Sequence, residues 1–288
     1  MSANINPAAN CKLTAIINMK GGVGKTTLSF NLSMELAFRG KRVLLIDLDP
    51  QANATLVCMS DAEQKKHKND SKKSITSIFI DAFEPRVPLN SGKKHKPEIS
   101  KYTFDVSVRP NNTAGGCLHF IPSDIYLSSV LRGVSIGPYT LDRLITEDVK
   151  GKYDYILIDC APTYSILTTI ALNTCRTVLI PMISDAFGKH GTDLMKQILD
   201  EHKHDFGVDV RVAGVVFTMV TKGQNQLGTR REIVGKWGSD VVFKASISHN
   251  DWYKVSNGER KSFKQTSASE DKKQELDDFV DQFIERMK

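Results

Sequence analysis

The chain has 288 residues, of which 40% are hydrophobic and 25% charged, a composition typical of a folded globular protein and not of a disordered or fibrous one. No apolar run approaches the roughly 20 residues that a membrane-spanning helix requires, and the first dozen residues lack the charged-then-apolar pattern of a secretory signal. The net charge of +6 is unevenly spread, because residues 60–101 and 222–264 are basic while residues 265–288 are acidic; this favours a polyanionic partner or, alternatively, solvated loops and helix faces.

Short apolar runs rich in β-branched residues alternate with segments of helical periodicity along the chain. The predicted strands are residues 13–18, 42–47, 153–159, 177–181 and 212–217. The predicted helices are residues 26–39, ending at Gly40, then 191–202 and 224–237. Near-continuous apolar strands are typical of sheets that are buried on both sides. The pattern therefore predicts an α/β fold, with a doubly wound, mainly parallel sheet and helices on both faces.

Residues 60–117 interrupt this alternation with a stretch rich in Lys, Ser, Pro and Asn, in which only residues 75–83 have a helical pattern. We expect an exposed basic insertion in a single domain that spans residues 1–288. The lysine clusters at 65–68 and 93–96 suit a partner site, an extra contact to nucleic acid or an inert surface. Flexible basic loops are usually solvated, which favours an inert or weakly contacting surface.

The most informative segment lies between the first strand and the first helix. Residues 20–27 read Lys-Gly-Gly-Val-Gly-Lys-Thr-Thr. Glycines at such a turn let backbone N–H groups surround phosphate oxygens, and the following helix directs its positive end at them. Lys25 is predicted to reach the β- and γ-phosphates, and the Thr26 hydroxyl to bind Mg²⁺. The usual phosphate-loop pattern has glycine where this chain has Met19, and a second lysine, Lys20, opens the loop instead.

With these residues the chain resembles the ParA/MinD group of ATPases, whose deviant phosphate loop reads KGGVGKTT. The segment RVLLIDLDPQANAT at residues 42–55 is similar to the ParA-type second motif, with Ala52 in a glycine position. The segment YDYILIDCAPTYSILTTIAL at residues 153–172 resembles the family's Walker B region, with Ala161 where proline is common. The resemblance covers residues 13–56 and about 120–250. It implies a dimerising, ATP- and Mg²⁺-dependent ATPase with the fold predicted above.

Asp47 and Asp159 end predicted strands and Asp49 lies just beyond the first of them, which supplies the carboxylates that phosphoryl transfer to water needs. Asp159 follows an apolar strand and is expected to hold Mg²⁺ through water. The resemblance implies that Asp49 positions the attacking water. It implies that Asp47 contacts the metal's ligands and not the metal itself. Spacing alone does not choose between Asp47 and Asp49. The metal residues are thus predicted as Thr26, Asp47 and Asp159, and the catalytic residues as Lys20, Lys25 and Asp49.

The resemblance also assigns residues around the nucleotide. It implies that Lys20 reaches across a homodimer to the partner's nucleotide, adding a cation only once two subunits meet. Adenine contacts are implied for the backbone near Thr218 and Met219 and for the segment after Ser246, where this chain has Ser248 in place of a frequent proline. The nucleotide-binding residues are predicted as Gly21, Gly22, Val23, Gly24, Lys25, Thr26, Thr27, Thr218 and Met219.

Members of the ParA group bind DNA without sequence preference when they are dimeric with ATP, through basic residues of the C-terminal half. The candidates here are Lys222, Arg230, Arg231, Lys254, Arg260 and Lys261. The family's arginine pattern near residues 247–254 is not reproduced, because His249 and Trp252 lie there. The resemblance implies that the protein drives the segregation or positioning of plasmid or chromosomal DNA. It also implies a ParB-like adaptor, which stimulates a weak ATP hydrolysis, and a cytoplasmic, nucleoid-associated location.

The main alternative is a MinD-like membrane-cycling ATPase or a protein-cargo positioning ATPase. A membrane-cycling protein would end in an amphipathic helix with a cationic polar face. The C-terminal segment has an apolar stripe at helical spacing, formed by Leu276, Phe279, Val280, Phe283, Ile284 and Met287. Its opposite face carries several acidic residues, which would repel anionic lipid. We therefore expect this helix to pack on the protein body and no membrane partner.

The cysteines argue against a redox or metal-cluster protein. Five scattered cysteines form no CxxC pair, which makes an iron–sulfur carrier or reductase a poor match and suits a reducing cytoplasm. A metabolic nucleotide kinase is also disfavoured, because no acceptor-binding motif is visible.

Overall fold

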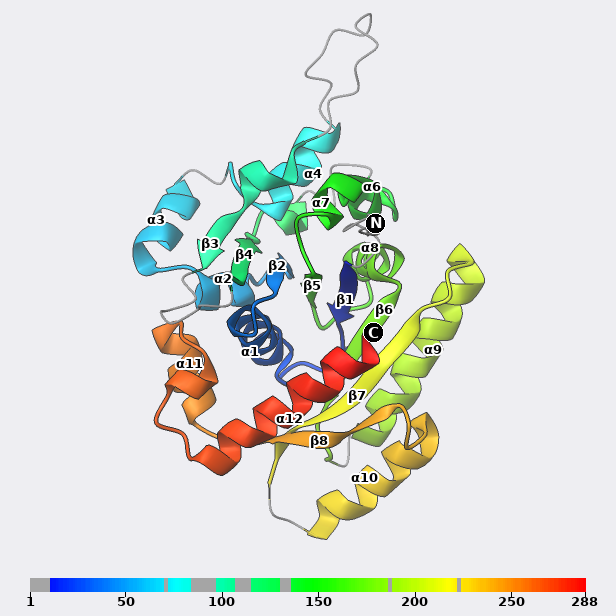
Figure 1. Ribbon diagram of the computed structural model, residues 1–288. Coiled ribbons are helices and arrows are strands. Elements are labelled where there is room, and N and C mark those ends of the chain that lie inside the picture. Colours follow the sequence, from blue (N-terminus) through cyan, green and yellow to red (C-terminus); the bar gives the residue numbers. More distant parts are fainter. Residues whose placement is uncertain are drawn as a thin grey trace, which may run out of the picture.

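A central sheet organises the part of the chain that the computed structural model describes, namely residues 11–69, 72–83, 97–106, 115–129, 136–185, 188–221 and 224–288 (Figure 1). Its eight strands follow the order β3-β4-β2-β5-β1-β6-β7-β8, and every neighbouring pair is parallel except β3 with β4. The strands are β1 (Lys12–Ile16), β2 (Arg42–Leu48), β3 (Phe104–Val106), β4 (Cys117–Ile121), β5 (Tyr155–Cys160), β6 (Thr177–Met182), β7 (Arg211–Val220) and β8 (Val242–Ser248).

Helices cover both faces of this sheet (Figure 1). The α-helices are α1 (Lys25–Phe38), α2 (Asn53–Cys58), α3 (Asp61–Asn69), α4 (Ile75–Phe83), α6 (Thr140–Leu144), α7 (Glu147–Lys150), α8 (Ile166–Cys175), α9 (Gly188–Phe206), α10 (Gln224–Trp237), α11 (Trp252–Glu259) and α12 (Glu270–Arg286). Two short 3₁₀ turns are η2 (Ile99–Tyr102) and η3 (Phe263–Gln265). The α/β fold with a doubly wound, mainly parallel sheet is thus confirmed.

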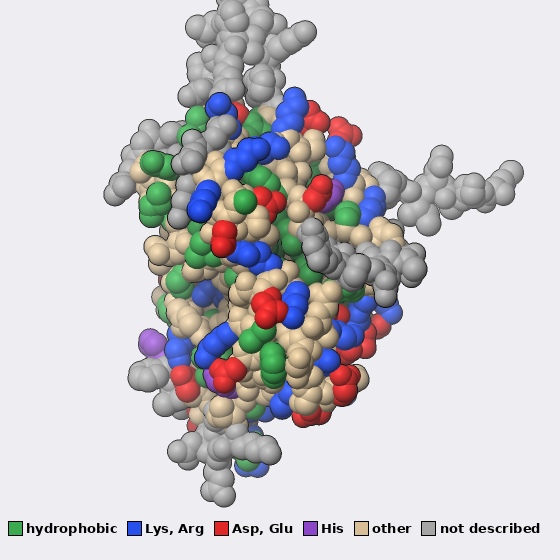
Figure 2. Space-filling view, turned by 90° about the vertical axis from the view of Figure 1, so that its left-hand side faces the viewer, with side chains coloured by type: hydrophobic (Ala, Val, Ile, Leu, Met, Phe, Trp, Pro, Cys, Tyr) green, Lys and Arg blue, Asp and Glu red, His purple; other side chains and the backbone are tan. Residues whose placement is uncertain are grey.

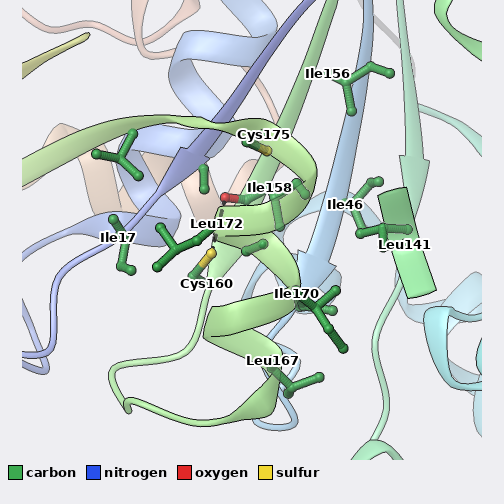
Figure 3. Packing of buried hydrophobic residues seen from close by; sticks show 14 of the residues in the cluster. Ile17, Ile46, Leu141, Ile156, Ile158, Cys160, Leu167, Ile170, Leu172 and Cys175 are labelled. Atoms are coloured by element: carbon green, nitrogen blue, oxygen red, sulfur yellow. Dashed lines mark hydrogen bonds between the residues drawn. The ribbon is translucent and has the colours of Figure 1, made fainter. Parts of the chain in front are cut away.

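Two apolar cores, one on each face, explain why the central strands are apolar throughout. Successive residues of one strand point to opposite faces, so in β5 Leu157 joins the core under α1 and α12, whereas Ile158 joins the core under α8 and α9. Figure 3 shows Ile17, Ile158 and Leu172 converging between α8 and the sheet. Burial on both sides removes the polar alternation that a one-sided strand would show.

The C-terminal helix α12 packs on the protein body, as predicted. Leu276 is 1% exposed and Phe279 and Phe283 are fully buried, and α12 lies along β8 and α1 (Figure 1). The Phe243 and Phe279 rings meet edge to face, with their centroids 5.2 Å apart. The apolar stripe is therefore used for internal packing. None of the helices in the described ranges is long and apolar enough to span a bilayer.

The expected exposure of residues 60–117 is wrong for several of its described apolar residues. Ile75, Ile78 and Phe79 are fully buried, because their helical spacing aligns them on one side of α4, which packs against the sheet. Ile99 of η2 joins the same core. The exposed part includes Lys65 and Lys66 on α3, while the 93–96 cluster lies outside the described residues.

Candidate functional site

The strand register gathers the predicted site residues at one edge of the sheet. Strand β5 lies between β1 and β2, with Asp159 paired to Ile16 on one side and to Asp47 on the other. Because parallel strands end at the same edge, the loop after β1 and both carboxylates meet there. Asp159 lies more than a hundred residues after the loop and Asp47 in the sequence, and the sheet brings all three together.

The glycine-rich loop has the backbone that a phosphate cradle needs. Gly22 and Gly24 have φ of 73° and 82°, in the left-handed region that side-chain-bearing residues avoid. A Cβ atom on Gly21 or Gly22 would meet no atom within 4 Å, so this part of the loop is open to a ligand. Gly24 caps the N-terminus of α1, whose first N–H groups favour an anion.

The two lysines of the loop have different environments. Lys25 is 7% exposed, and its Nζ donates to the carbonyl oxygens of Asn18 at 2.9 Å and Lys20 at 3.1 Å. Burial lowers the pKa of Lys25, and the nearby Asp159 carboxylate opposes that shift. The Lys20 Nζ instead donates to Asp185 at 2.5 Å, and both side chains of this ion pair are about one-third exposed. Asp185 was not among the residues predicted from the sequence.

Asp159 is buried and held by two hydroxyl groups of α1. Thr26 Oγ1 donates to one carboxylate oxygen at 2.7 Å, and Ser29 Oγ donates to the other at 2.9 Å. Burial raises the pKa of Asp159 to about 6, against the effect of these hydrogen bonds. Ser29 was missed from the sequence, although it lies one helical turn after Lys25. The hydroxyl–carboxylate pair is an oxygen donor set of the kind that Mg²⁺ prefers, and a cation there would compensate the buried charge.

Asp47 is fully buried and anchors the segment that follows β2. Its Oδ2 accepts from the Thr55 N–H at 2.9 Å and the Thr55 hydroxyl at 2.8 Å, and its Oδ1 accepts from the Asp49 N–H at 3.1 Å. Burial first, and the Asp159 carboxylate second, raise the pKa of Asp47 to about 8. Asp49 is 6% exposed, and its Oδ1 accepts from the Gln51 N–H at 2.9 Å. Asp47 thus holds the backbone of Asp49 in place.

A pocket beside the glycine loop contains the predicted base-contact residues. Thr218 Oγ1 donates to the Val23 carbonyl at 2.8 Å, which ties the end of β7 to the loop. Met219 has φ of 53°, and its Cε would lie 3.6 Å from a Cβ on Gly24. Residues 247–250 also line the pocket, as the resemblance implies. No sequence signal pointed to Asn257, whose Nδ2 donates to Thr27 Oγ1 at 3.0 Å.

Among the described residues, no group of three or more His, Cys, Asp or Glu side chains is arranged to hold a metal ion on its own. A cation at Thr26 and Asp159 would therefore take its remaining ligands from a bound phosphate or from water. All five cysteines lie within the described residues and carry free thiols.

The predicted DNA-contacting residues have mixed environments. Arg231 is exposed, whereas the Arg230 guanidinium lies 4.5 Å from the centre of the Phe217 ring and is partly buried. The remaining described candidates form ion pairs, which are Lys254–Asp251 at 2.8 Å, Arg260–Asp61 at 2.6 Å and Lys261–Glu259. On the side that carries α3 and α11, basic and acidic side chains are interspersed (Figure 2). Exposed ion pairs of this kind are weak and can exchange partners. Lys222 lies outside the described residues.

A family model described as an AAA domain matches residues 11–209 of the chain. The sporulation initiation inhibitor protein Soj of Bacillus subtilis is 33% identical over 241 residues, which cover 83% of this chain and 85% of Soj. The chromosome partitioning protein ParA of Caulobacter vibrioides is 29% identical over 245 residues, covering 83% and 81% of the two chains.

Solved structures share the fold at lower identity. A complex of Cyanothece McdA with ATP has a TM-score of 0.75 at 19% identity, over 96% of this chain and 97% of McdA. A putative plasmid partition protein of Borrelia burgdorferi bound to AMPPNP has a TM-score of 0.72 at 22% identity, over 96% and 99%. At these identities the likeness establishes the fold.

The raised pKa of Asp159 predicts a pH-dependent effect of removing its charge. Its folded-state pKa of about 6 lies above the ordinary value of 3.8, so its contribution to stability is full below about pH 4 and is lost as pH rises through 6. Asp159→Asn imitates the protonated form and should stabilise the nucleotide-free protein by up to about 3 kcal/mol at pH 8, but by only about 1 kcal/mol at pH 4.5. Thermal unfolding followed by circular dichroism at both pH values measures this difference. As a control, Asp148→Asn, at an exposed carboxylate, should leave the stability unchanged at both pH values. An equal stabilisation by Asp159→Asn at both pH values would contradict the prediction.

Proposed function

We propose that this chain, which belongs to the Soj/ParA family of chromosome- and plasmid-partitioning ATPases, is a nucleotide-driven switch that positions DNA. In this proposal it binds Mg²⁺-ATP, forms a homodimer, associates with non-specific double-stranded DNA and is reset by slow hydrolysis that a ParB-like adaptor stimulates. The observation that carries the proposal is the convergence of the glycine loop, Lys25, Asp49 and the Thr26–Asp159 pair at one sheet edge.

The glycine loop and α1 supply the phosphate site. The open backbone at Gly21 and Gly22 and the N-terminus of α1 suit the β- and γ-phosphates, and the Lys25 ammonium lies buried at the same loop. Mg²⁺, when bound, neutralises phosphate charge, and the Thr26 hydroxyl and Asp159 carboxylate fit as its direct and water-mediated partners. The ATP-bound McdA and AMPPNP-bound Borrelia structures support this choice of nucleotide.

Hydrolysis needs a water molecule aligned with the γ-phosphate, and we assign that task to Asp49. The carboxylate follows β2 directly, and the buried Asp47 fixes its backbone through the Asp49 N–H. Asp47 has its oxygens occupied by protein donors and therefore acts as a support. Catalysis then consists of positioning and charge stabilisation, as in other phosphoryl transfers.

Lys20 is assigned to the partner subunit's nucleotide. In the single chain its ammonium is paired with Asp185, at a partly exposed position beside the loop. A γ-phosphate on a facing subunit would offer this ammonium a stronger anionic partner than one carboxylate. Dimerisation would then complete the site with a cation supplied in trans, and ATP would become the signal for assembly.

Basic side chains of the C-terminal half are assigned to DNA. Arg231 on α10 is exposed, and the ion-paired Lys254, Arg260 and Lys261 lie in exposed or half-buried positions from which a phosphate could recruit them. The burial of the α12 apolar stripe removes the feature that a MinD-like membrane anchor would use. This favours DNA over a membrane as the surface on which the protein acts.

The ATPase assignment predicts a split between binding and turnover. Asp49→Ala should lower kcat by about 100-fold or more while ATP still binds, because only the water-positioning group is lost. Lys25→Ala should abolish ATP binding. Phosphate release, with and without plasmid DNA, and binding of a fluorescent ATP analogue measure the two effects. Asp148→Ala serves as the control, and normal turnover of Asp49→Ala would remove Asp49 from its role.

The trans role of Lys20 predicts a variant that binds nucleotide and stays monomeric. Lys20→Ala should keep most of its ATP affinity, because Lys25 remains, and should lose the ATP-dependent dimer. Light scattering coupled to size exclusion, with a non-hydrolysable ATP analogue, reports the mass. The exposed Lys152→Ala is the matched control. A normal dimer of Lys20→Ala would refute the assignment.

Non-specific DNA binding predicts a steep salt dependence. In the presence of ATP, affinity for any duplex should fall between about 50 and 200 mM salt, with a log–log slope of about −0.9 for each phosphate contact. Arg231→Glu should weaken binding and flatten that slope, whereas Lys152→Glu should do neither. Gel shifts with two unrelated duplexes test this, and no binding at the lowest salt would exclude the DNA role.

A further inference from the structure

Helix α3 carries two lysines that neither the ATPase site nor the DNA contacts assigned above use. Lys65 and Lys66 are exposed, and within the described ranges neither of them forms an ion pair. From composition, this basic segment is expected to be a flexible, solvated loop, which would make it an inert surface. Both lysines lie instead on a helix that is fixed at its start and along its inner side.

A capping box fixes the start of α3. The Ser60 N–H and the Ser60 hydroxyl donate to Glu63 Oε2 at 2.7 and 2.6 Å, and the Glu63 N–H donates back to Ser60 Oγ at 3.3 Å. The carboxylate of Glu63 is therefore used within the helix, as a partner of its first turn. It does not neutralise the two lysines that follow it.

The inner side of α3 is anchored to the protein body. Gln64 Nε2 donates to the Met59 carbonyl at 2.9 Å, and His67, which is 6% exposed, has its Nε2 3.2 Å from the Ser123 carbonyl. Gln64 and His67 also line a cavity that includes Asp124. Residues 65 and 66 follow Gln64 by about 100° and 200° around the helix, so their side chains project from the outer side.

An ion pair joins α3 to the basic C-terminal half of the chain. Arg260, which directly follows α11, lies 2.6 Å from the Asp61 carboxylate, and the Asp61 side chain is 85% exposed. Asp61 precedes Lys65 by four residues, so the two lie on the same side of α3. Helices α3 and α11 lie on one side of the molecule (Figure 1). The lysines of α3 therefore extend the basic surface that contains Arg260.

The outer side of α3 has the chemistry of a phosphate-contacting surface. Its exposed side chains among the described residues are those of Asp61, Ala62, Lys65 and Lys66, and none of them is aromatic or large and apolar, as the anchor of a protein interface would be. Interfaces with DNA are polar and strongly basic. An unpaired lysine contacts a phosphate without giving up an ion pair, whereas Arg260 must first release Asp61.

Helix α3 is also attached to the sheet edge that carries the ATPase site. Only residues 59 and 60 separate it from α2, and the buried Asp47 holds α2 through the Thr55 N–H and hydroxyl. A polyanion bound to α3 would thus act on the same segment of chain that supports Asp49.

We propose that Lys65 and Lys66 contact the phosphates of double-stranded DNA, which lies across α3 and takes the place of Asp61 at Arg260. The choice of DNA as the occupant rests on the proposed function. In this arrangement Asp61 is an internal competitor that weakens DNA binding.

The first test removes the two lysine charges. Lys65→Gln/Lys66→Gln keeps the helix propensity. Fluorescence anisotropy of a labelled duplex, with the full chain and ATP, should show about tenfold weaker binding at about 100 mM salt and a log–log salt slope shallower by about 1.8. Lys152→Gln/Lys203→Gln removes the same charge from exposed positions elsewhere and should bind as the unaltered protein does.

Equal affinities and slopes of the two double variants would overturn the proposal and leave the proposed function standing, provided that the unaltered protein binds the duplex. No binding by the unaltered protein would overturn both. Phosphatidylserine vesicles that sediment the unaltered protein but not Lys65→Gln/Lys66→Gln would also overturn the proposal, because anionic lipid would then be the occupant of α3.

The second test removes the competitor. Asp61→Asn frees Arg260 and should strengthen DNA binding about threefold. Asp148→Asn is the matched control, because Asp148 is likewise an exposed carboxylate in the first turn of a helix, and it should leave DNA binding unchanged. Unchanged or weaker binding by Asp61→Asn would show that DNA does not reach Arg260 across α3, which overturns the proposal.

Discussion

The parallel pairing of β5 with β1 on one side and β2 on the other is the constraint on which the site depends. It places Asp159 beside Asp47 at the edge where the glycine loop begins. Burial raises the pKa of both carboxyl groups, to about 6 for Asp159 and about 8 for Asp47, and the nearby Asp159 carboxylate adds to the shift of Asp47. The unliganded site is thus poised to gain from a cation, which gives metal and nucleotide binding a thermodynamic driving force.

Hydrogen bonds, not ion pairs, hold these carboxylates in place. Thr26 and Ser29 hold Asp159 from α1, and Thr55 holds Asp47 from α2, so each acidic group ties a helix to a strand end. The helix that presents the phosphate loop is therefore fixed to the same sheet edge as the acidic groups. A change in charge at that edge acts directly on α1 and α2, the two helices that these hydrogen bonds hold.

Thr55 gives this arrangement a second connection. It joins Asp47 to the loop after β4, so the segment carrying Asp49 lies between the phosphate site and the cavity lined by His67 and Asp124. The hydroxyl of Thr55 thus connects the loop after β4 to the carboxylate that holds the Asp49 backbone.

The sequence alone determined the fold class and the strand–loop–helix around Lys25. It also predicted three aspartates at or just after strand ends. Apolar runs, glycine spacing and carboxylates near strand ends are local signals, which is why the sequence records them. It also predicted that the C-terminal helix packs inward, since an acidic face opposes an apolar stripe. Within residues 60–117 it predicted the helix at 75–83 but missed its burial, because the polar composition of the surrounding segments concealed the buried side of α4. Only the tertiary structure decided that Asp47 holds the backbone of Asp49, that Ser29 and Asp185 contact the site, and that His67 lies in one cavity with Asp124. Those contacts link residues whose partners are chosen by sheet register and packing, which no local pattern records.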